Sequence, residues 1–353
     1  MHGIIGEDEL LERCNHIFFR KVVFVVVCLI AVVLVAGLAM TIGSYNIGFW
    51  ESYEVAWNHI CGNITDVSKD YVVWKVRMPQ IVAGIIAGAG LAICGTVMQG
   101  TMKNPLADPY TTGISSGAAF GATIAMVLNF SVLGNGYAIV GNAFIFSLIP
   151  MAIIMLISAT RRASPTMIIL SGIAVMYIFN AMTTVLMLMA DPDDLADVYS
   201  WQVGSLGNSR WENNLIMAVF VIAGLIATEL LSNKINILAA GDDTAKSLRI
   251  NADHLRLLCL LIVSLTAAAV VSFTGIIGFV GLVCPHICRI FVGSDNRVLI
   301  PASAAFGAAL MIVSDLIGRT VIAPAVLQVG VITAFIGGPM FIYLLMREKK
   351  DVW

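Results

Sequence analysis

Residues 241–248 contain the residue types of a phosphate-binding loop, since a glycine is followed by a lysine and a serine. A nucleotide-binding P-loop needs a second glycine directly before its lysine, because the backbone must approach the phosphates closely there. In this chain Ala245 precedes Lys246, the spacing is one residue short, and no strand is predicted before the segment. We therefore predict no nucleotide site but a short polar helix with Asp242 or Asp243 as its N-cap. Such a helix is either an ordinary interfacial loop or a surface that docks a cytosolic partner.

Cys284, His286 and Cys288 are a second group of residues with possible chemistry, because cysteine and histidine are common metal ligands. On a helix, Cys284 and Cys288 share a face, whereas His286 points about 200° away from it. No fourth ligand lies nearby in the sequence. We therefore predict no metal site here, but a buried helix that starts at Pro285.

Asp315 and Arg319 are four residues apart, so on a helix they share a face. Charges inside a membrane are usually paired or functional, so they form either a local ion pair or a site where Arg319 offers its charge to a partner. Arg77, which precedes another apolar run, could do the same. The acidic run at 191–197 is interpreted as a solvated loop, because its spacing does not match a calcium-binding loop.

Catalysis has little support in the sequence. There is no HExxH motif, and no Gly-x-Ser-x-Gly motif lies on a predicted strand, turn and helix. The five histidines are dispersed along the chain rather than clustered. We therefore predict no catalytic residues and no resident cofactor.

The amino-acid composition indicates the kind of fold that carries these residues. Of 353 residues, 59% are hydrophobic and 12% are charged, and the mean hydropathy is +0.92. A soluble fold of this size could not cover its surface with so few polar residues, so a free-standing soluble enzyme and a disordered protein are excluded. The net charge of −2 gives no indication of a nucleic-acid partner. The chain is predicted to be an all-α polytopic membrane protein with about ten spans.

The apolar runs predict one transmembrane domain over 1–353, with a cytoplasmic N-terminus at 1–21, a ten-helix bundle at 22–346, a cytoplasmic loop at 233–255 and a cytoplasmic tail at 347–353. The predicted spans cover 22–43, 80–100, 112–130, 138–160, 166–190, 214–232, 256–274, 277–291, 299–318 and 329–346. Small residues repeat every four positions, as at Gly84 and Gly88, which favours close helix packing.

The basic residues predict the orientation, because cytoplasmic loops carry the excess of Lys and Arg. With both termini inside, five of the 20 basic residues lie outside and the other 15 lie inside; the outside set is Lys69, Lys75, Arg77, Arg210 and Arg319. This distribution favours an even number of spans. A re-entrant eighth segment would invert the assignments that follow it.

Several sequence blocks match one known family in order and spacing, across most of 77–346. They are Arg77-Met78-Pro79, the run Asn104-Pro105-Leu106-Ala107-Asp108-Pro109, Gly241-Asp242 with Ala245 and Leu248, Gly278-Phe279-Val280-Gly281-Leu282, Pro285-His286 with Arg289, Asp315 with Arg319, and Gly337-Gly338-Pro339. On these blocks the chain resembles the permease subunits of binding-protein-dependent ABC importers for iron–siderophore complexes, haem and vitamin B12, the FecCD family.

The resemblance implies the fold of the vitamin B12 importer's permease and three kinds of protein partner in the cytoplasmic (inner) membrane of a prokaryote. These are a separate ABC ATPase subunit inside, a substrate-binding protein outside, and a second permease, either another copy in a homodimer or a paralogue. Membrane lipid surrounds them.

The resemblance also assigns roles to individual residues. Gly241, Asp242, Ala245 and Leu248 match the coupling helix that sits in a groove of the ATPase. Arg77 and Arg319 match outward arginines that pair with glutamates of the binding protein. Gln80 departs from the family, which often has a second basic residue there. Asn104 and Leu106 match an inner gate, as do Pro165 and Thr166.

The expected function is therefore the import of an iron chelate of the siderophore type, and haem or cobalamin would use the same machinery. Two other classes stay open. An ion-gradient-driven secondary transporter would need intramembrane carboxylates or helices broken at the midplane, and Glu229 and Asp315 are the clear candidates for the former. A structural or assembly protein of the membrane would not need a coupling helix.

Overall fold

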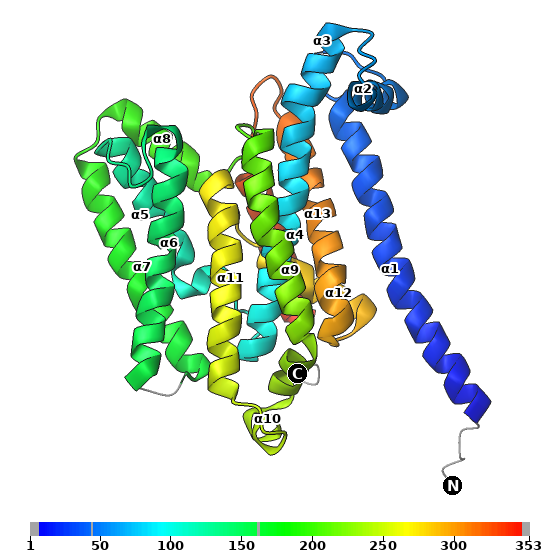
Figure 1. The fold of residues 1–353 in the computed structure, drawn as a ribbon, viewed down its shortest axis with the longest axis vertical. Coiled ribbons are helices and arrows are strands. Elements are labelled where there is room, and N and C mark those ends of the chain that lie inside the picture. The colour runs from blue at the N-terminus through cyan, green and yellow to red at the C-terminus, as the bar shows by residue number, and fades with distance from the viewer. Residues whose placement is uncertain (1–6, 44, 161–162, 348–353) are drawn as a thin grey trace.

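The computed structural model describes residues 7–43, 45–160 and 163–347, and within these residues it contains helices and no strand. The long helices run side by side between two ends of the molecule (Figure 1). One end, the α2 end, carries the short helices α2 (Phe49–Cys61), α3 (Val67–Asp70) and α8 (Pro192–Val203). The opposite end, the α10 end, carries α10 (Asp242–Ser247).

Each predicted span overlaps one of the main helices. They are α1 (Glu7–Thr41), α4 (Met78–Met102), α5 (Ile114–Val127), α6 (Ala138–Thr160), α7 (Pro165–Leu188), α9 (Trp211–Ala240), α11 (Ala252–Thr274), α12 (Val280–Val292), α13 (Asn296–Thr320) and α14 (Val329–Arg347). Within the described residues, seven helical segments are long and apolar enough to cross a membrane. The apolar stretches of α5, α12 and α14 are shorter.

Two of the connections between the predicted spans contain helices. Residues 44–79 hold α2, α3 and the π-helical turn η1 (Tyr71–Arg77), and α8 occupies most of the acidic segment interpreted above as a loop. Asp191 and Pro192 start α8, because proline fits the first turn of a helix. The hydropathy profile missed these helices since they are short and partly polar.

Two spans are broken, which explains why α5 and α12 are short. After α4 the chain is non-helical until the turn η2 (Pro109–Thr112), and after α11 it is non-helical from Gly275 to Phe279. The two breaks meet inside the bundle, where the Tyr110 hydroxyl donates to the Ile277 carbonyl at 3.0 Å. Side chains must satisfy backbone groups at such breaks, because lipid cannot.

The helix around Pro285 starts earlier than predicted. Phe279, with φ +68°, ends the non-helical break, and α12 begins at Val280, so Pro285 lies inside the helix. Proline has no N–H to give to the carbonyl of residue 281. The Gln99 amide of α4 donates to that Gly281 carbonyl instead, at 3.5 Å. The predicted start was wrong because a neighbouring helix supplies the missing donor.

The eighth segment passes from one end of the molecule to the other. It leaves α11 at the α2 end, where the Ser205 N–H donates to the Thr274 carbonyl at 2.7 Å. It reaches α13 at the α10 end, where the Asn296 N–H donates to Asn236 Oδ1 of α9 at 2.8 Å. α14 starts at the α2 end, where the Gly330 N–H donates to the Gly204 carbonyl at 3.3 Å, and runs back toward the α10 end.

α4 is the central helix, and most of its residues are buried. Glycines bring its backbone against two neighbours. A Cβ added at Gly88 would lie 2.2 Å from the Gly307 carbonyl oxygen of α13, and one added at Gly95 would lie 1.8 Å from the Gly281 carbonyl oxygen of α12. Van der Waals packing of small residues is the main drive for helix association in lipid, so these contacts fix the bundle.

Replacing Gly95 by alanine should therefore destabilise the protein, because the methyl group meets backbone that cannot rotate away. The expected cost is about 1–3 kcal/mol or more, typical of an overpacked core. Thermal unfolding of the purified protein measures it. Gly278→Ala is the matched control, since nothing lies within 4 Å of a Cβ at Gly278. Equal melting temperatures for the two variants would contradict this packing.

Candidate functional site

The predicted coupling segment forms a short helix between two long ones. α9 ends at Ala240, Gly241 turns the chain at φ +135°, and α10 follows with six residues. The N-cap is Gly241, without a side-chain cap, so the prediction of Asp242 or Asp243 as N-cap was wrong. Both aspartates lie in the first turn, where their charge is favourable to the helix dipole. α9 precedes this segment, where a P-loop would have a strand.

The coupling residues face in different directions. Ala245 is 0% exposed and packs in an apolar cluster with Leu238 of α9 and Leu255 of α11. Leu248 is 56% exposed at the end of α10. Ala245 therefore anchors α10 to the rest of the chain, while Leu248 presents an apolar side chain on the surface of the molecule. A large residue at position 245 would disturb this anchor before it reached any partner.

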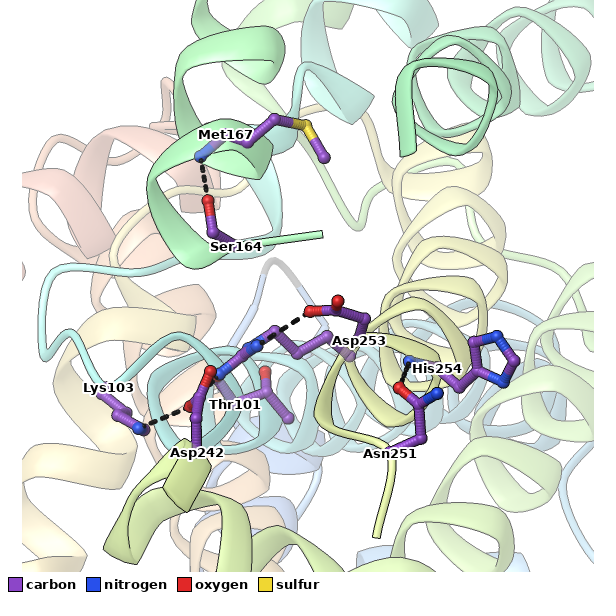
Figure 2. Close-up of polar contacts among 9 residues, drawn as sticks. Thr101, Lys103, Ser164, Met167, Asp242, Asn251, Asp253 and His254 are labelled. Carbon is purple, nitrogen blue, oxygen red and sulfur yellow. Dashed lines mark hydrogen bonds and ion pairs between the residues drawn. The ribbon is translucent and has the colours of Figure 1, made fainter. Parts of the chain in front are cut away.

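Asp242 fastens the start of α10 to the end of α4 (Figure 2). Its Oδ1 accepts from Lys103 Nζ at 2.7 Å and from Arg256 Nη2 at 2.5 Å. The Arg256 bond, and after it the Lys103 bond, lower the pKa of the Asp242 carboxyl against the opposing effect of partial burial. The attachment is thus complete above the ordinary carboxyl pKa of about 4 and is lost as pH falls through the lower native value.

The first predicted gate segment begins one residue after Lys103. Asn104 Oδ1 accepts from the Leu106 N–H at 2.9 Å, and the Ala107 N–H donates to the Asn104 carbonyl at 3.0 Å, so the segment is a tight turn. The Leu106 side chain is 45% exposed. The gate segment therefore lies at the α10 end, directly joined to α4.

The second predicted gate segment is the start of α7. Pro165 is the first helical residue, and Ser164 caps the helix by accepting from the Met167 N–H at 3.2 Å (Figure 2). Thr166 is exposed. The two gate segments and α10 share one apolar cluster, which contains Ala107, Ala163, Ile168 and Ala245. The structure thus brings the predicted coupling and gate residues to the same end of the molecule.

Arg77, at the α2 end, does not present its charge to the outside as predicted. It is 5% exposed, and its guanidinium donates to the carbonyls of Met40, Thr41 and Tyr45, the last two at 3.3 and 2.8 Å. The Met40 and Thr41 carbonyls are at the end of α1, where a helix leaves acceptors unpaired and its dipole favours a cation, and the Tyr45 carbonyl follows in the next connection. The exposure prediction was wrong because the end of α1 lies over Arg77.

Arg319 is partly buried beside it. Its Nη2 lies 2.8 Å from Asp315 Oδ2, and its Nη1 donates to the Ala39 carbonyl at 3.3 Å. Gln80, the residue that departs from the family, donates to Asp315 Oδ1 at 2.9 Å. The local ion pair predicted from the spacing is present, and it joins α1, α4 and α13.

Arg256, the largest fully buried side chain among the described residues, was not predicted as a functional residue. Its position at the start of a predicted span made it look like an ordinary cytoplasmic anchor. The buried Asp108 at the first break was not predicted either. The Pro and Gly residues within 104–113 were the available signal for that break.

Cys284 and Cys288 are both buried on one face of α12. In the part of the chain that the structure describes, no group of three or more His, Cys, Asp or Glu side chains is arranged to hold a metal.

Comparisons with known proteins agree with this architecture. The model of the FecCD transport family matches residues 26–347. The hemin transport system permease protein of Yersinia pestis is 34% identical over 321 residues, covering 90% of this chain and 95% of that protein. The cobalamin import system permease protein of Halobacterium salinarum is 39% identical over 280 residues, covering 79% of this chain and 74% of that protein.

A solved structure is similar over nearly the whole chain. It shows an inward-facing conformation of a metal-chelate type ABC transporter, with a TM-score of 0.82, 29% identity, and coverage of 92% of this chain and 99% of that one. The family match spans the bundle, both gate segments and α10. The chain belongs to the FecCD transport family, and it is a multi-pass permease of the prokaryotic cytoplasmic membrane.

Proposed function

We propose that this chain, as a single transmembrane domain over 1–353, is the permease subunit of an ABC importer for an iron chelate of the siderophore type. A separate ATPase subunit docks on α10, and a substrate-binding protein docks on the α2 end. The permease works as a pair, with a second copy or a paralogue. ATP is hydrolysed on the ATPase subunit and not on this chain.

The observation that carries this proposal is the construction of α10. Leu248, at the end of this short helix, is exposed on the surface of the molecule. Ala245 and Asp242 hold the helix to the main bundle beside Asn104–Leu106. An exposed apolar side chain on a firmly held helix is suited to a pocket on a partner protein. A carrier without a motor would have no use for this element.

The substrate class is supported by a cavity between α5, α7 and the second break. Its volume is about 320 Å³, and uncharged polar side chains dominate its lining; they are Ser115, Ser116, Asn180, Thr183, Thr184 and Gln202. Hydroxyl and amide groups suit a chelate that hides its metal and offers hydrogen-bonding groups at its periphery. A bare divalent cation would favour carboxylate ligands. Haem and cobalamin are the alternative cargoes.

One observation favours an ion-gradient-driven carrier. The two breaks and the buried Asp108 resemble the discontinuous helices that such carriers place at the midplane. Asp315, in contrast, is already ion-paired at the α2 end. The family and the form of α10 make the ATP-driven importer the stronger proposal.

Replacing Leu248 by serine should weaken attachment of the ATPase, because the exposed apolar contact is lost. Truncation of a central contact residue typically costs about 2 kcal/mol or more in binding, so roughly a 30-fold loss of affinity is expected. Co-purification of the ATPase and ATP-dependent uptake in proteoliposomes measure the effect. Lys246→Ser, which alters another exposed residue of α10, is the control. Wild-type attachment and uptake with Leu248→Ser would contradict the coupling role.

At the α2 end, we propose that Arg77 and Arg319 contribute to docking by exchanging their contacts with the carbonyls at and just after the end of α1 for carboxylates of the binding protein. Arg77→Gln and Arg319→Gln should then weaken docking, most strongly at low ionic strength, because charge attraction is screened by salt. Binding of the purified binding protein to the permease complex at two salt concentrations measures this.

Lys75→Gln and Arg210→Gln are the matched comparisons, since both residues are exposed cations near the same end. Melting temperatures control for the structural role of Arg77. Docking that depends on Lys75 and Arg210 but not on Arg77 and Arg319 would contradict the assignment.

A further inference from the structure

Arg256, in the first turns of α11, has more connections than an anchor at a membrane surface needs. Its side chain is 1% exposed, so the guanidinium has left water almost completely. Moving a charge out of water is costly unless partners surround it. The contacts of Arg256 therefore identify the segments of the chain that must surround its guanidinium for the charge to remain buried.

The guanidinium contacts three elements at once. Nε donates to the Thr101 carbonyl in the last turn of α4 at 3.2 Å. Nη2 donates to Asp242 of α10 at 2.5 Å, and Nη1 lies 3.5 Å from Asp253 Oδ1 in the first turn of α11. Figure 2 shows the acceptors Thr101, Asp242 and Asp253 facing the same point from these helices. One buried cation thus joins α4, α10 and α11.

Lys103 supports the same junction from the solvent side. Its Nζ lies 2.7 Å from the Asp242 oxygen that Arg256 also uses, and the side chains of Lys103 and Asp242 are 33% and 50% exposed. Because this pair is exposed, water and salt weaken it. The buried Arg256 is therefore the stronger of the two attachments of Asp242.

The end of α4 leads directly into the first gate segment. Thr101 lies three residues before Asn104, and Lys103 lies directly before it. The Asn104 N–H donates back to the Gln99 carbonyl of α4 at 3.3 Å. A displacement of Asp242 therefore has a short path, through the guanidinium and a few residues of backbone, to Asn104 and Leu106. Tightly packed junctions transmit shifts as discrete rearrangements rather than absorbing them.

We propose that Arg256 is a positioning residue that makes α10 and the end of α4 move as one unit, so that motion imposed on α10 reaches the gate segment Asn104–Leu106. The proposal rests on the coupling role of α10 proposed above. Arg256 itself is too deeply buried to contact an ATPase, so its effect passes through Asp242 and Thr101.

The test is the number of cargo molecules imported per ATP hydrolysed, measured with the complete importer in proteoliposomes. The probes are radio-iron ferrichrome, ferric citrate, haemin and cyanocobalamin, and the comparison uses whichever of them the wild-type importer carries. In Arg256→Gln the complex should stay assembled and hydrolyse ATP while import per ATP falls roughly 2- to 30-fold, and Asp242→Ala should lower the same ratio. Combining both substitutions should add little, because they break the same linkage.

Two further variants sharpen this experiment. Arg256→Lys keeps the charge but cannot donate to Thr101 and Asp242 with the same fork of N–H groups, so it should restore the ratio only in part. Asp243→Ala removes the neighbouring exposed carboxylate of α10 and should leave the ratio at the wild-type value. If Arg256→Gln does not fold, Asp242→Ala decides the outcome.

Wild-type import per ATP in Asp242→Ala or Arg256→Gln would overturn the proposal. So would a parallel fall of import and ATP hydrolysis, or loss of the ATPase from the complex, because either would mean that the linkage only maintains the structure or the docking surface. A wild-type importer that carries none of the four probes with ATP would instead count against the proposed function.

Discussion

Backbone-to-backbone packing along α4 is the constraint on which the rest of the structure depends. Gly88 and Gly95 let α4 touch the carbonyls of α13 and α12 directly, with no side chain between them. Helices in lipid associate by such close packing and by hydrogen bonds, because burial from water contributes little between them. The centre of α4 is therefore held firmly, and its two ends project into the two regions where partners are proposed to dock.

Both ends of α4 are fastened by arginines that lie out of water. At the α2 end, Arg77 donates to the last carbonyls of α1 and to the Tyr45 carbonyl just after it. At the α10 end, Arg256 holds Thr101 and Asp242. Arginine suits these positions because its rigid guanidinium can donate to several carbonyl or carboxylate oxygens at once. The same central helix thus connects the proposed docking surface for the binding protein with the helix proposed to meet the ATPase.

The two broken spans exist because side chains replace the missing helical partners. Gln99 donates to the carbonyl that Pro285 leaves unpaired, and Tyr110 donates across the breaks to Ile277. Unpaired backbone groups would be too costly in lipid, so such breaks occur only inside a protein. Ile276 of the second break also lines the polar cavity beside α5 and α7, where a cargo is proposed to bind.

The sequence predicted the large features well because hydropathy and spacing report them directly. The apolar runs located each main helix, the four-residue spacing of Asp315 and Arg319 indicated their ion pair, and 241–248 was expected to be a short helix. It could not predict burial that depends on distant parts of the chain. Arg77 looked exposed because nothing local shows that α1 ends over it, and Ala245 could not be separated from Leu248 without the packing of α9 and α11. The start of α12 was misplaced because Gln99, far away in the sequence, makes an internal proline tolerable.

The energy source of transport tests the account most directly. The complete importer in proteoliposomes, with binding protein outside and ATP inside, should take up one of the iron chelates, haemin or cyanocobalamin when no ion gradient is imposed. An imposed proton or sodium gradient without ATP should drive no uptake. Uptake that follows the gradient and ignores ATP would contradict the account and identify the chain as a secondary carrier.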